Sequence, residues 1–180
     1  MSNSPSTDYP VEFTLPAVKS ALESRLAGCA QLQSGTDKGL PRKPVVVFTN
    51  GVFDLIHPGH VLSLRAAASN GDLLVVGINS DESVRRLKGP QRPVIPARER
   101  AKILASMEMV DFVVIFDEDT PLQVVEALRP DVIAKGAEYQ GREVVGAQVV
   151  ESHGGRVAYL PMQDGVSSTT IIERIIQAHP

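Results

Sequence analysis

From residue 45 onward, short apolar runs alternate with longer segments whose apolar residues recur at helical spacing. The runs are rich in β-branched residues, and a continuous apolar run is typical of a strand covered on both faces. Five strands are predicted, at residues 45–49, 73–79, 112–116, 131–136 and 156–160. Helices are predicted between and after them, at residues 59–71, 96–107, 121–129, 143–155 and 168–179.

This alternation predicts an α/β fold, a Rossmann-like doubly wound parallel five-stranded sheet with helices on both faces. In such a sheet, ligands bind at the carboxyl ends of the strands, near the switch in strand order. The end of the first strand and the start of the next helix, around residues 49–60, are therefore the first place to look for a site.

The first 44 residues follow a different pattern, so two parts are predicted: an N-terminal extension at 1–44 and the α/β domain at 45–180. Residues 1–10 are polar and are expected to be loose. Residues 17–32 carry Val18, Leu22, Leu26 and Cys29 at helical spacing, and residues 33–44 have the composition of a linker. The helix is expected to pack on the domain or on a partner subunit, which makes a homodimer one hypothesis.

The composition argues against several classes of protein. Of the 180 residues 43% are hydrophobic, and the net charge is −3, which gives no general attraction to nucleic acid or to an anionic membrane. No run approaches the roughly 20 apolar residues of a membrane span, and no secretory signal is recognised at the N-terminus. The single cysteine, Cys29, forms no internal disulfide, so a cytoplasmic protein is expected.

Two of the four histidines, His57 and His60, stand three residues apart at the predicted start of a helix. Positions i and i+3 share a helix face, Pro58 suits a first turn, and Gly59 leaves room for a ligand near the backbone. Two imidazole donors beside a helix N-terminus suit a phosphate. The spacing alone is equally compatible with loop histidines at a turn. A metal site is disfavoured because no third ligand stands nearby.

Two further segments favour an anionic ligand. Residues 83–98 contain Arg85, Arg86, Lys88, Arg92 and Arg98 and no acidic residue, and we interpret part of this stretch as a mobile flap over a polyphosphate. Near the last helix, Thr170 and Glu173 fit a capping box, which leaves hydroxyl groups free to meet a phosphate. Phosphate-binding groups without a nucleophile indicate direct in-line displacement at phosphorus. The free hydroxyls are Ser167, Ser168 and Thr169.

The motif "GVFDLIHPGH" resembles the GxFDxxHxGH signature of the HxGH nucleotidyltransferase superfamily, and "VSSTTII" resembles its second signature, ISSTxxI. A closer resemblance is to the heptose-1-phosphate adenylyltransferases of lipopolysaccharide precursor synthesis, carried by "INSDESVRRLKGPQRPV", "VDFVVIFDEDTP" and "HGGRV". It covers residues 45–177. That family's domain is often fused behind a sugar kinase. No kinase is present in this sequence, so it resembles the stand-alone form, which implies that a separate kinase and phosphatase supply the sugar phosphate.

The resemblance implies transfer of AMP from ATP to a sugar 1-phosphate, D-glycero-D-manno-heptose 1-phosphate, giving ADP-heptose and pyrophosphate. Mg²⁺ is expected on the triphosphate, held by phosphate and water rather than by a protein site. The implied catalytic residues are His57, His60 and Lys88. The implied nucleotide-binding residues are Asn50, Gly51, Val52, Phe53, Gly59, Lys135, Gly136, Ser167, Ser168 and Thr169. The implied substrate-binding residues are Asp54, Arg85, Arg100 and Glu138.

One departure bears on the substrate. Where the family has Lys-Gly-Gly-Asp-Tyr, this chain has Ala137 and Glu138 at the third and fourth positions. Ala137 adds a methyl group where glycine allows a positive φ or a close ligand, and Glu138 reaches one carbon further. Two alternatives therefore stay open: a cytidylyltransferase acting on glycerol 3-phosphate or another polyol or sugar phosphate, and a non-catalytic nucleotide-binding module.

Overall fold

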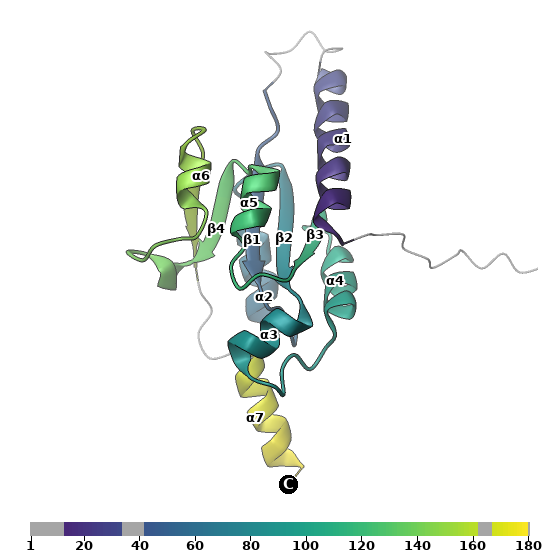
Figure 1. Ribbon diagram of the computed structural model, residues 1–180, viewed down its shortest axis with the longest axis vertical. Helices are drawn as coiled ribbons and strands as arrows, with labels where there is room; N and C mark the ends of the chain where they lie inside the picture. The colour runs from purple at the N-terminus through teal and green to yellow at the C-terminus, as the bar shows by residue number, and fades with distance from the viewer. Residues whose placement is uncertain (1–12, 34–41, 162–166, 180) are drawn as a thin grey trace, which may run out of the picture.

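The computed structural model describes residues 13–33, 42–161 and 167–179 (Figure 1). Its centre is a five-stranded, all-parallel sheet in the order β3-β2-β1-β4-β5, which confirms the predicted fold class. The strands are β1 (Val46–Gly51), β2 (Leu73–Asn79), β3 (Phe112–Phe116), β4 (Val132–Gly136) and β5 (Arg156–Leu160). The predictions for residues 1–10 and for most of the linker at 33–44 lie outside the described residues.

The switch in strand order lies between β1 and β4. The chain runs outward from β1 to β2 and β3, then returns to the other side of β1 and continues to β4 and β5. Strand β1 pairs with β2 along its full length, but its pairing with β4 covers only Val47 with Val132 and Phe48 with Ile133. The carboxyl ends of β1 and β4 are therefore not paired with each other, and this leaves a crevice at the switch point.

Helices cover both faces of the sheet. On one face α2 (Pro58–Ala68) and α4 (Ala97–Ala105) supply buried residues to one apolar cluster with β1, β2 and β3. On the other face α1 (Leu15–Gln33), α5 (Leu122–Leu128) and α6 (Ala147–Glu151) form a second cluster with the opposite side of the strands. The alternation of side chains along each strand feeds both clusters, as expected for a sheet buried on both sides.

The N-terminal segment is part of this core. Val18 and Leu22 on α1 are each 3% exposed and belong to the cluster with α5, and Figure 1 shows α1 alongside β3. Just before the helix, Phe13 is buried in the cluster on the opposite face, and its carbonyl accepts a hydrogen bond from the Ile115 N–H at 2.8 Å. The segment therefore passes around the outer side of β3 and contributes to both cores.

Two helices differ from the prediction. Residues 81–88 form α3 (Asp81–Lys88), which includes the first six residues of the stretch 83–98, part of which was predicted to be a mobile flap. The Ser80 side chain accepts a hydrogen bond from the Ser83 N–H and starts this helix, and its last residue precedes Gly89 at φ +99°. Helix α6 is shorter than the predicted 143–155, because Gly146 at φ +87° interrupts the chain just before it.

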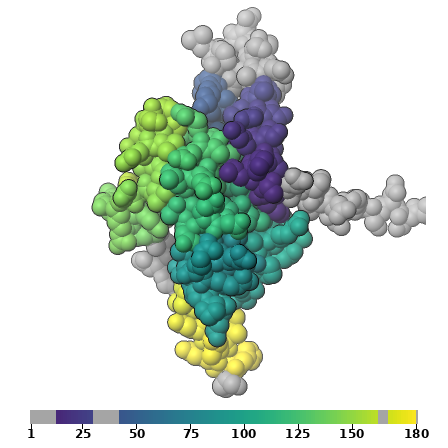
Figure 2. Space-filling view, viewed as in Figure 1, coloured from purple at the N-terminus to yellow at the C-terminus, as the bar shows by residue number. Residues whose placement is uncertain are grey.

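The last helix, α7 (Ser168–Ala178), stands apart from the two layers. It has no buried residue and projects beyond the carboxyl end of the sheet (Figures 1 and 2). The capping box predicted for Thr170 and Glu173 is wrong: Ser167 caps the helix, and its side chain and that of Thr170 exchange hydrogen bonds with each other's backbone. Among the described helices, none combines the length and hydrophobicity needed to span a membrane.

Candidate active site

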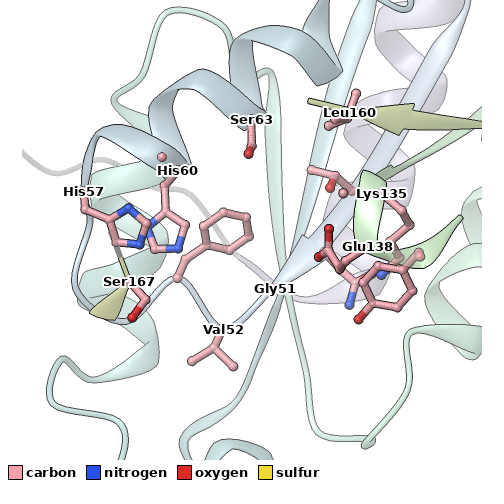
Figure 3. Close-up of a pocket in the computed structure, with 15 residues that line it drawn as sticks. Gly51, Val52, His57, His60, Ser63, Lys135, Glu138, Leu160 and Ser167 are labelled. Atoms are coloured by element: carbon pink, nitrogen blue, oxygen red, sulfur yellow. The ribbon is translucent and has the colours of Figure 1, made fainter. Parts of the chain in front are cut away.

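A pocket of about 330 Å³ opens at the carboxyl ends of β1 and β4, where the pairing of these strands stops (Figure 3). Its walls come from segments far apart in the sequence: the end of β1 with the following turn, the first turns of α2, the end of β4 with the short 3₁₀ helix η1 (Ala137–Tyr139), and the start of α7. The predicted residues that line it are Asn50, Gly51, Val52, Phe53, His57, Gly59, His60, Lys135, Gly136, Glu138 and Ser167.

The two histidines form one wall. His57 is the residue before α2, Pro58 occupies the first helical position, and the His57 carbonyl accepts a hydrogen bond from the His60 N–H at 2.9 Å. This turn brings the rings together, with centroids 3.7 Å apart and planes 25° from parallel. Phe53, at φ +49°, places its ring 5.1 Å from that of His60 and supports it from the other side.

Both imidazoles are electrically neutral near pH 7. Burial lowers the pKa of His57, and burial together with the positive charge that His57 would carry lowers the pKa of His60 to about 4. A neutral imidazole has one N–H donor and one acceptor nitrogen. The buried Nδ1 atoms of both rings have no hydrogen-bond partner among the described residues. The wall therefore holds unused polar atoms beside a pocket, as a ligand site requires.

Lys135 and Glu138 form the opposite wall (Figure 3). Lys135 is 9% exposed at the end of β4, its ammonium donates a hydrogen bond to Asn50 Oδ1, and its Nζ lies 5.1 Å from the centre of the Tyr139 ring. Burial, partly offset by the charge of Glu138, lowers the pKa of Lys135 to about 8. The Glu138 carboxylate folds back over Gly136, where a Cβ would collide with it.

Ala137 causes no backbone conflict in this wall. It is exposed, and the described non-glycine residues with positive φ are Phe53 and Arg129. The residue that replaces the family's second glycine therefore fits the 3₁₀ turn, and the departure affects the pocket through the longer side chain of Glu138.

Asp54 and Arg100, which the resemblance assigns to the substrate, lie behind the pocket. Asp54 is 1% exposed, forms a 2.6 Å ion pair with Arg92 and accepts hydrogen bonds from the N–H groups of Val94 and Ile95. Burial tends to raise the pKa of Asp54, but the backbone N–H groups and Arg92 outweigh it, so the pKa is lowered and the carboxylate stays ionised. Asp54 thus anchors the loop at residues 92–95.

Arg100 is fully buried, so a direct contact with substrate would need its surroundings to open. Its guanidinium donates to the carbonyls of Val52, at 2.6 Å, and Asn79, at 2.9 Å, and forms a 2.8 Å ion pair with Asp81. These bonds link the turn after β1 to the end of β2. Arg100 therefore holds in place the backbone that lines the pocket.

The cationic segment does not line the pocket. Arg85 and Lys88 are exposed on α3, and neither forms an ion pair with the residues that the structure describes. Arg86 instead forms an ion pair with Asp119 at 2.8 Å. Of the three predicted hydroxyl groups, only that of Ser167 lines the pocket. Ser168 donates to the Leu55 carbonyl at 3.0 Å, and Thr169 is exposed.

Four lining residues were not predicted: Thr49, Ser63, Tyr139 and Leu160. Thr49 donates its hydroxyl to the Ala134 carbonyl at 3.0 Å, next to the point where β1 and β4 separate. Ser63 lies three residues after His60, so the helical spacing used for the histidines also indicates it. Tyr139 directly follows the predicted Glu138 in the turn after β4, so its neighbours in the sequence also indicate it. Leu160 reaches the pocket through the pairing of β4 with β5, for which the sequence carries no local signal.

The described residues contain no group of three or more His, Cys, Asp or Glu side chains placed to hold a metal ion. Glu138 is the carboxylate that lines the pocket. The pocket is therefore suited to binding an anionic, hydroxyl-bearing ligand, with neutral donors on one wall and a cation beside a carboxylate on the other.

Comparison with other proteins places the chain in a family. A family profile described as Cytidylyltransferase-like matches residues 48–174. The bifunctional protein HldE of Syntrophotalea carbinolica is 56% identical over 138 residues, which are 77% of this chain and 28% of that protein. The bifunctional protein HldE of Geotalea uraniireducens is 61% identical over 130 residues, which are 72% of this chain and 26% of that protein. The chain thus spans about a quarter of the length of these relatives.

Solved structures share the fold. The lipopolysaccharide core biosynthesis protein of Thermoplasma volcanium superimposes with a TM-score of 0.56 at 25% identity, covering 68% of this chain and 99% of that one. The pantoate-beta-alanine ligase of Francisella tularensis superimposes with a TM-score of 0.54 at 15% identity, covering 92% of this chain and 77% of that one. The matched profile spans β1 to α7 and includes every wall of the pocket. The chain therefore belongs to the cytidylyltransferase-like family.

Proposed function

We propose that this protein transfers the adenylyl group of ATP to D-glycero-D-manno-heptose 1-phosphate, forming ADP-heptose and pyrophosphate. The observation that carries this proposal is the stacked pair of neutral histidines in a pocket at the switch point, within a chain that is 56% and 61% identical to two bifunctional HldE proteins. The sequence resemblance to heptose-1-phosphate adenylyltransferases supplies the acceptor and the base. A structural neighbour described as a lipopolysaccharide core biosynthesis protein agrees with this assignment.

In the proposed reaction, a phosphate oxygen of the sugar phosphate attacks the α-phosphorus of ATP. A new P–O bond forms, the bond between the α-phosphorus and the bridging oxygen breaks, and pyrophosphate leaves with the electron pair. His57 and His60 donate hydrogen bonds to the phosphate oxygens on which charge accumulates. Because both rings are neutral, they act as fixed donors and need no change of protonation during the reaction.

Mg²⁺ is proposed to bind the triphosphate through phosphate oxygens and water. A single carboxylate in the pocket lining fits that arrangement better than an all-protein cage. When bound, the ion would neutralise charge on the leaving pyrophosphate.

Lys88 is proposed to contact the β- and γ-phosphates, with help from Arg85. Their exposed ammonium and guanidinium groups, at the end of α3 and free of ion pairs with the described residues, support this role. Ser167 is proposed to meet the triphosphate from the start of α7, with Ser168 and Thr169 as the adjoining hydroxyls. Asp54 and Arg100 are proposed to act on the substrate through the loops that they hold.

The test is pyrophosphate release from ATP, CTP, GTP and UTP, each with heptose 1-phosphate and with glycerol 3-phosphate. We expect turnover with ATP and heptose 1-phosphate, and a loss of about 10²- to 10³-fold in kcat for His60→Ala. Preference for CTP with glycerol 3-phosphate would instead make the protein a polyol-phosphate cytidylyltransferase, an alternative that is compatible with the family description. Binding of ATP without turnover on either acceptor would indicate a non-catalytic module.

A homodimer in the cytoplasm is also proposed. The helix α1, which the sequence suggested for a partner subunit, packs on its own domain, so the dimer is proposed to form through α7 instead. Ile175 and Ile176 on this helix are 53% and 63% exposed, and the neighbouring Glu173 and Arg174 have opposite charges. Two antiparallel copies of such a helix can pair their isoleucines and match their charges, which makes a second copy the fitting partner. Sedimentation of wild type and of Ile176→Lys tests this: a dimer that becomes a monomer is expected, and a wild-type monomer contradicts it.

A further inference from the structure

Lys135 differs from the other deeply buried cation of the described chain. The buried Arg100 is neutralised by Asp81 and by three backbone carbonyls. Lys135 forms no ion pair with the described carboxylates. Its ammonium instead contacts the neutral amide oxygen of Asn50 and the face of the Tyr139 ring. Lys135 is therefore a buried positive charge without a negative partner at bonding distance, in the wall of a pocket.

Such an arrangement costs free energy in the empty protein, because an ammonium loses its water and receives no counter-charge in return. An ammonium has three N–H donors, and Asn50 accepts one of them. The remaining donors are available to a ligand on the pocket side. An anion placed there would supply the missing counter-charge, so this wall is prepared for a phosphate that is different from the one facing the histidines.

Glu138 limits which anion fits. Its carboxylate lines the same wall and lies over Gly136, and its negative charge acts to raise the pKa of Lys135. A triphosphate next to Glu138 would be repelled, whereas a carboxylate readily accepts hydrogen bonds from hydroxyl groups. A wall with one cation and one carboxylate therefore suits a molecule with a single phosphate beside several hydroxyls, which is a sugar phosphate rather than the nucleoside triphosphate.

We propose that Lys135 binds the phosphate of the acceptor sugar and that Glu138 accepts hydrogen bonds from its hydroxyls. This inference rests on the proposed function and concerns the same pocket. It divides the pocket into a donor side at His57 and His60 and an acceptor side at Lys135 and Glu138, which Figure 3 shows facing each other. It replaces the assignment of Lys135 to the nucleotide, which the sequence resemblance implied.

The test is steady-state kinetics of full-length Lys135→Met with ATP and heptose 1-phosphate. Methionine keeps most of the length of the side chain and removes the charge. We expect the KM for heptose 1-phosphate to rise about 10- to 150-fold, the effect of losing a hydrogen bond to a charged group, with the KM for ATP changed less than about twofold. A rise in the KM for ATP, or no change in either KM, overturns the inference.

Two further variants separate the loss of the charge from a loss of folding. Lys102→Met, on the exposed side of α4, removes a lysine outside the pocket and should leave both KM values unchanged. Lys135→Arg keeps the charge and serves if the methionine variant does not fold. It changes the shape and reach of the cation, so it should raise the KM for heptose 1-phosphate above that of wild type and leave the KM for ATP unchanged. An effect confined to ATP, or no change in either KM, overturns the inference.

A separate binding measurement keeps the two proposals distinguishable. If wild type releases no pyrophosphate with this acceptor, the proposed function fails. Calorimetric titration with heptose 1-phosphate, without ATP, then tests Lys135 alone. Weaker binding by Lys135→Met than by wild type supports the acceptor site, and equal affinity or no binding to wild type overturns it.

Discussion

His57 and His60 gain their chemical character from each other and from burial. Their ring centroids lie 3.7 Å apart, and burial lowers the pKa of both. A positive charge on His57 would also disfavour protonation of His60. Neutral rings bind phosphate more weakly than imidazolium ions would in the ground state. In the proposed reaction their charge would stay the same throughout, which would favour selective stabilisation of the more highly charged transition state.

The lowered pKa of His60 predicts a pH-dependent stability. The unfolded chain takes up a proton near pH 6.5, whereas folded His60 does so only near pH 4, so stability is complete above pH 6.5 and falls as the pH decreases toward 4. His60→Gln removes this titration. Between pH 7 and pH 5, urea unfolding of wild type should lose about 1–2 kcal/mol more than that of the variant, after allowance for solvent screening. Equal losses in both proteins would contradict the assigned pKa.

The sequence identifies the residues that are close to a motif, but it does not reveal the surroundings of residues whose partners come from elsewhere in the chain. His57 and His60 are predicted by their spacing and lie in the pocket. Arg100 resembles a substrate-binding arginine, yet Val52, Asn79 and Asp81 from distant segments surround it and remove it from the surface. Local patterns carry no information about such partners, because they depend on how β1, β2 and α4 pack.

Loop 92–95 is tied to the turn after β1 by one buried carboxylate. Asp54 holds Arg92 and two backbone N–H groups, and this turn also carries Phe53, which supports His60. The elements that form the histidine wall are therefore connected to a segment outside the pocket. A change at Asp54 is expected to act on the site by releasing this connection.

Asp54→Asn tests the connection. It removes the charge that Arg92 neutralises, so the free energy of unfolding should fall by about 2–4 kcal/mol. A double-mutant cycle with Arg92→Met should show a coupling of at least about 1 kcal/mol, because each residue then lacks its partner. Additive effects of the two substitutions would indicate that the ion pair contributes little. Chemical unfolding of the four proteins provides the measurement.

The sequence predicted which helices and strands exist more completely than it predicted the residues at which they begin and end. Three strands, β2, β3 and β5, begin and end at the predicted residues, because each is a short, mainly apolar run between the helices on either side. Helix α3 was missed because its charged residues were interpreted as a flap, although Ser80 and the acidic Asp81 and Glu82 form a typical helix start. The exposed position of α3 leaves no apolar stripe strong enough to reveal it.

The complete fold depends on a segment that lies outside the matched family region. Residues 48–174 match the family profile, yet Val18 and Leu22 of α1 fill the core on one face of the sheet. The sequence indicated a helix here but left open what it packs against. The structure supplies the answer because the apolar side of α1 meets α5 and β3 within the same chain.

Leu22→Ala should therefore destabilise the protein by about 2–4 kcal/mol, the usual effect of truncating a buried leucine. Leu62→Ala on α2 is a matched control, because Leu62 is 49% exposed and its loss should cost less than about 1 kcal/mol. Thermal or urea unfolding of both variants gives the comparison. Similar effects of the two substitutions would mean that α1 does not contribute to the core.

The hydrogen bond between the Phe13 carbonyl and the Ile115 N–H has a consequence beyond stability. Strand β3 ends the sheet on its side, and an uncovered terminal strand offers its backbone to other chains. Because the Phe13 carbonyl bonds to β3 and the Phe13 ring is buried, we expect this contact to limit the pairing of β3 with other chains. Loss of this contact is expected to expose the edge of β3 and to let the protein assemble into larger species through that strand.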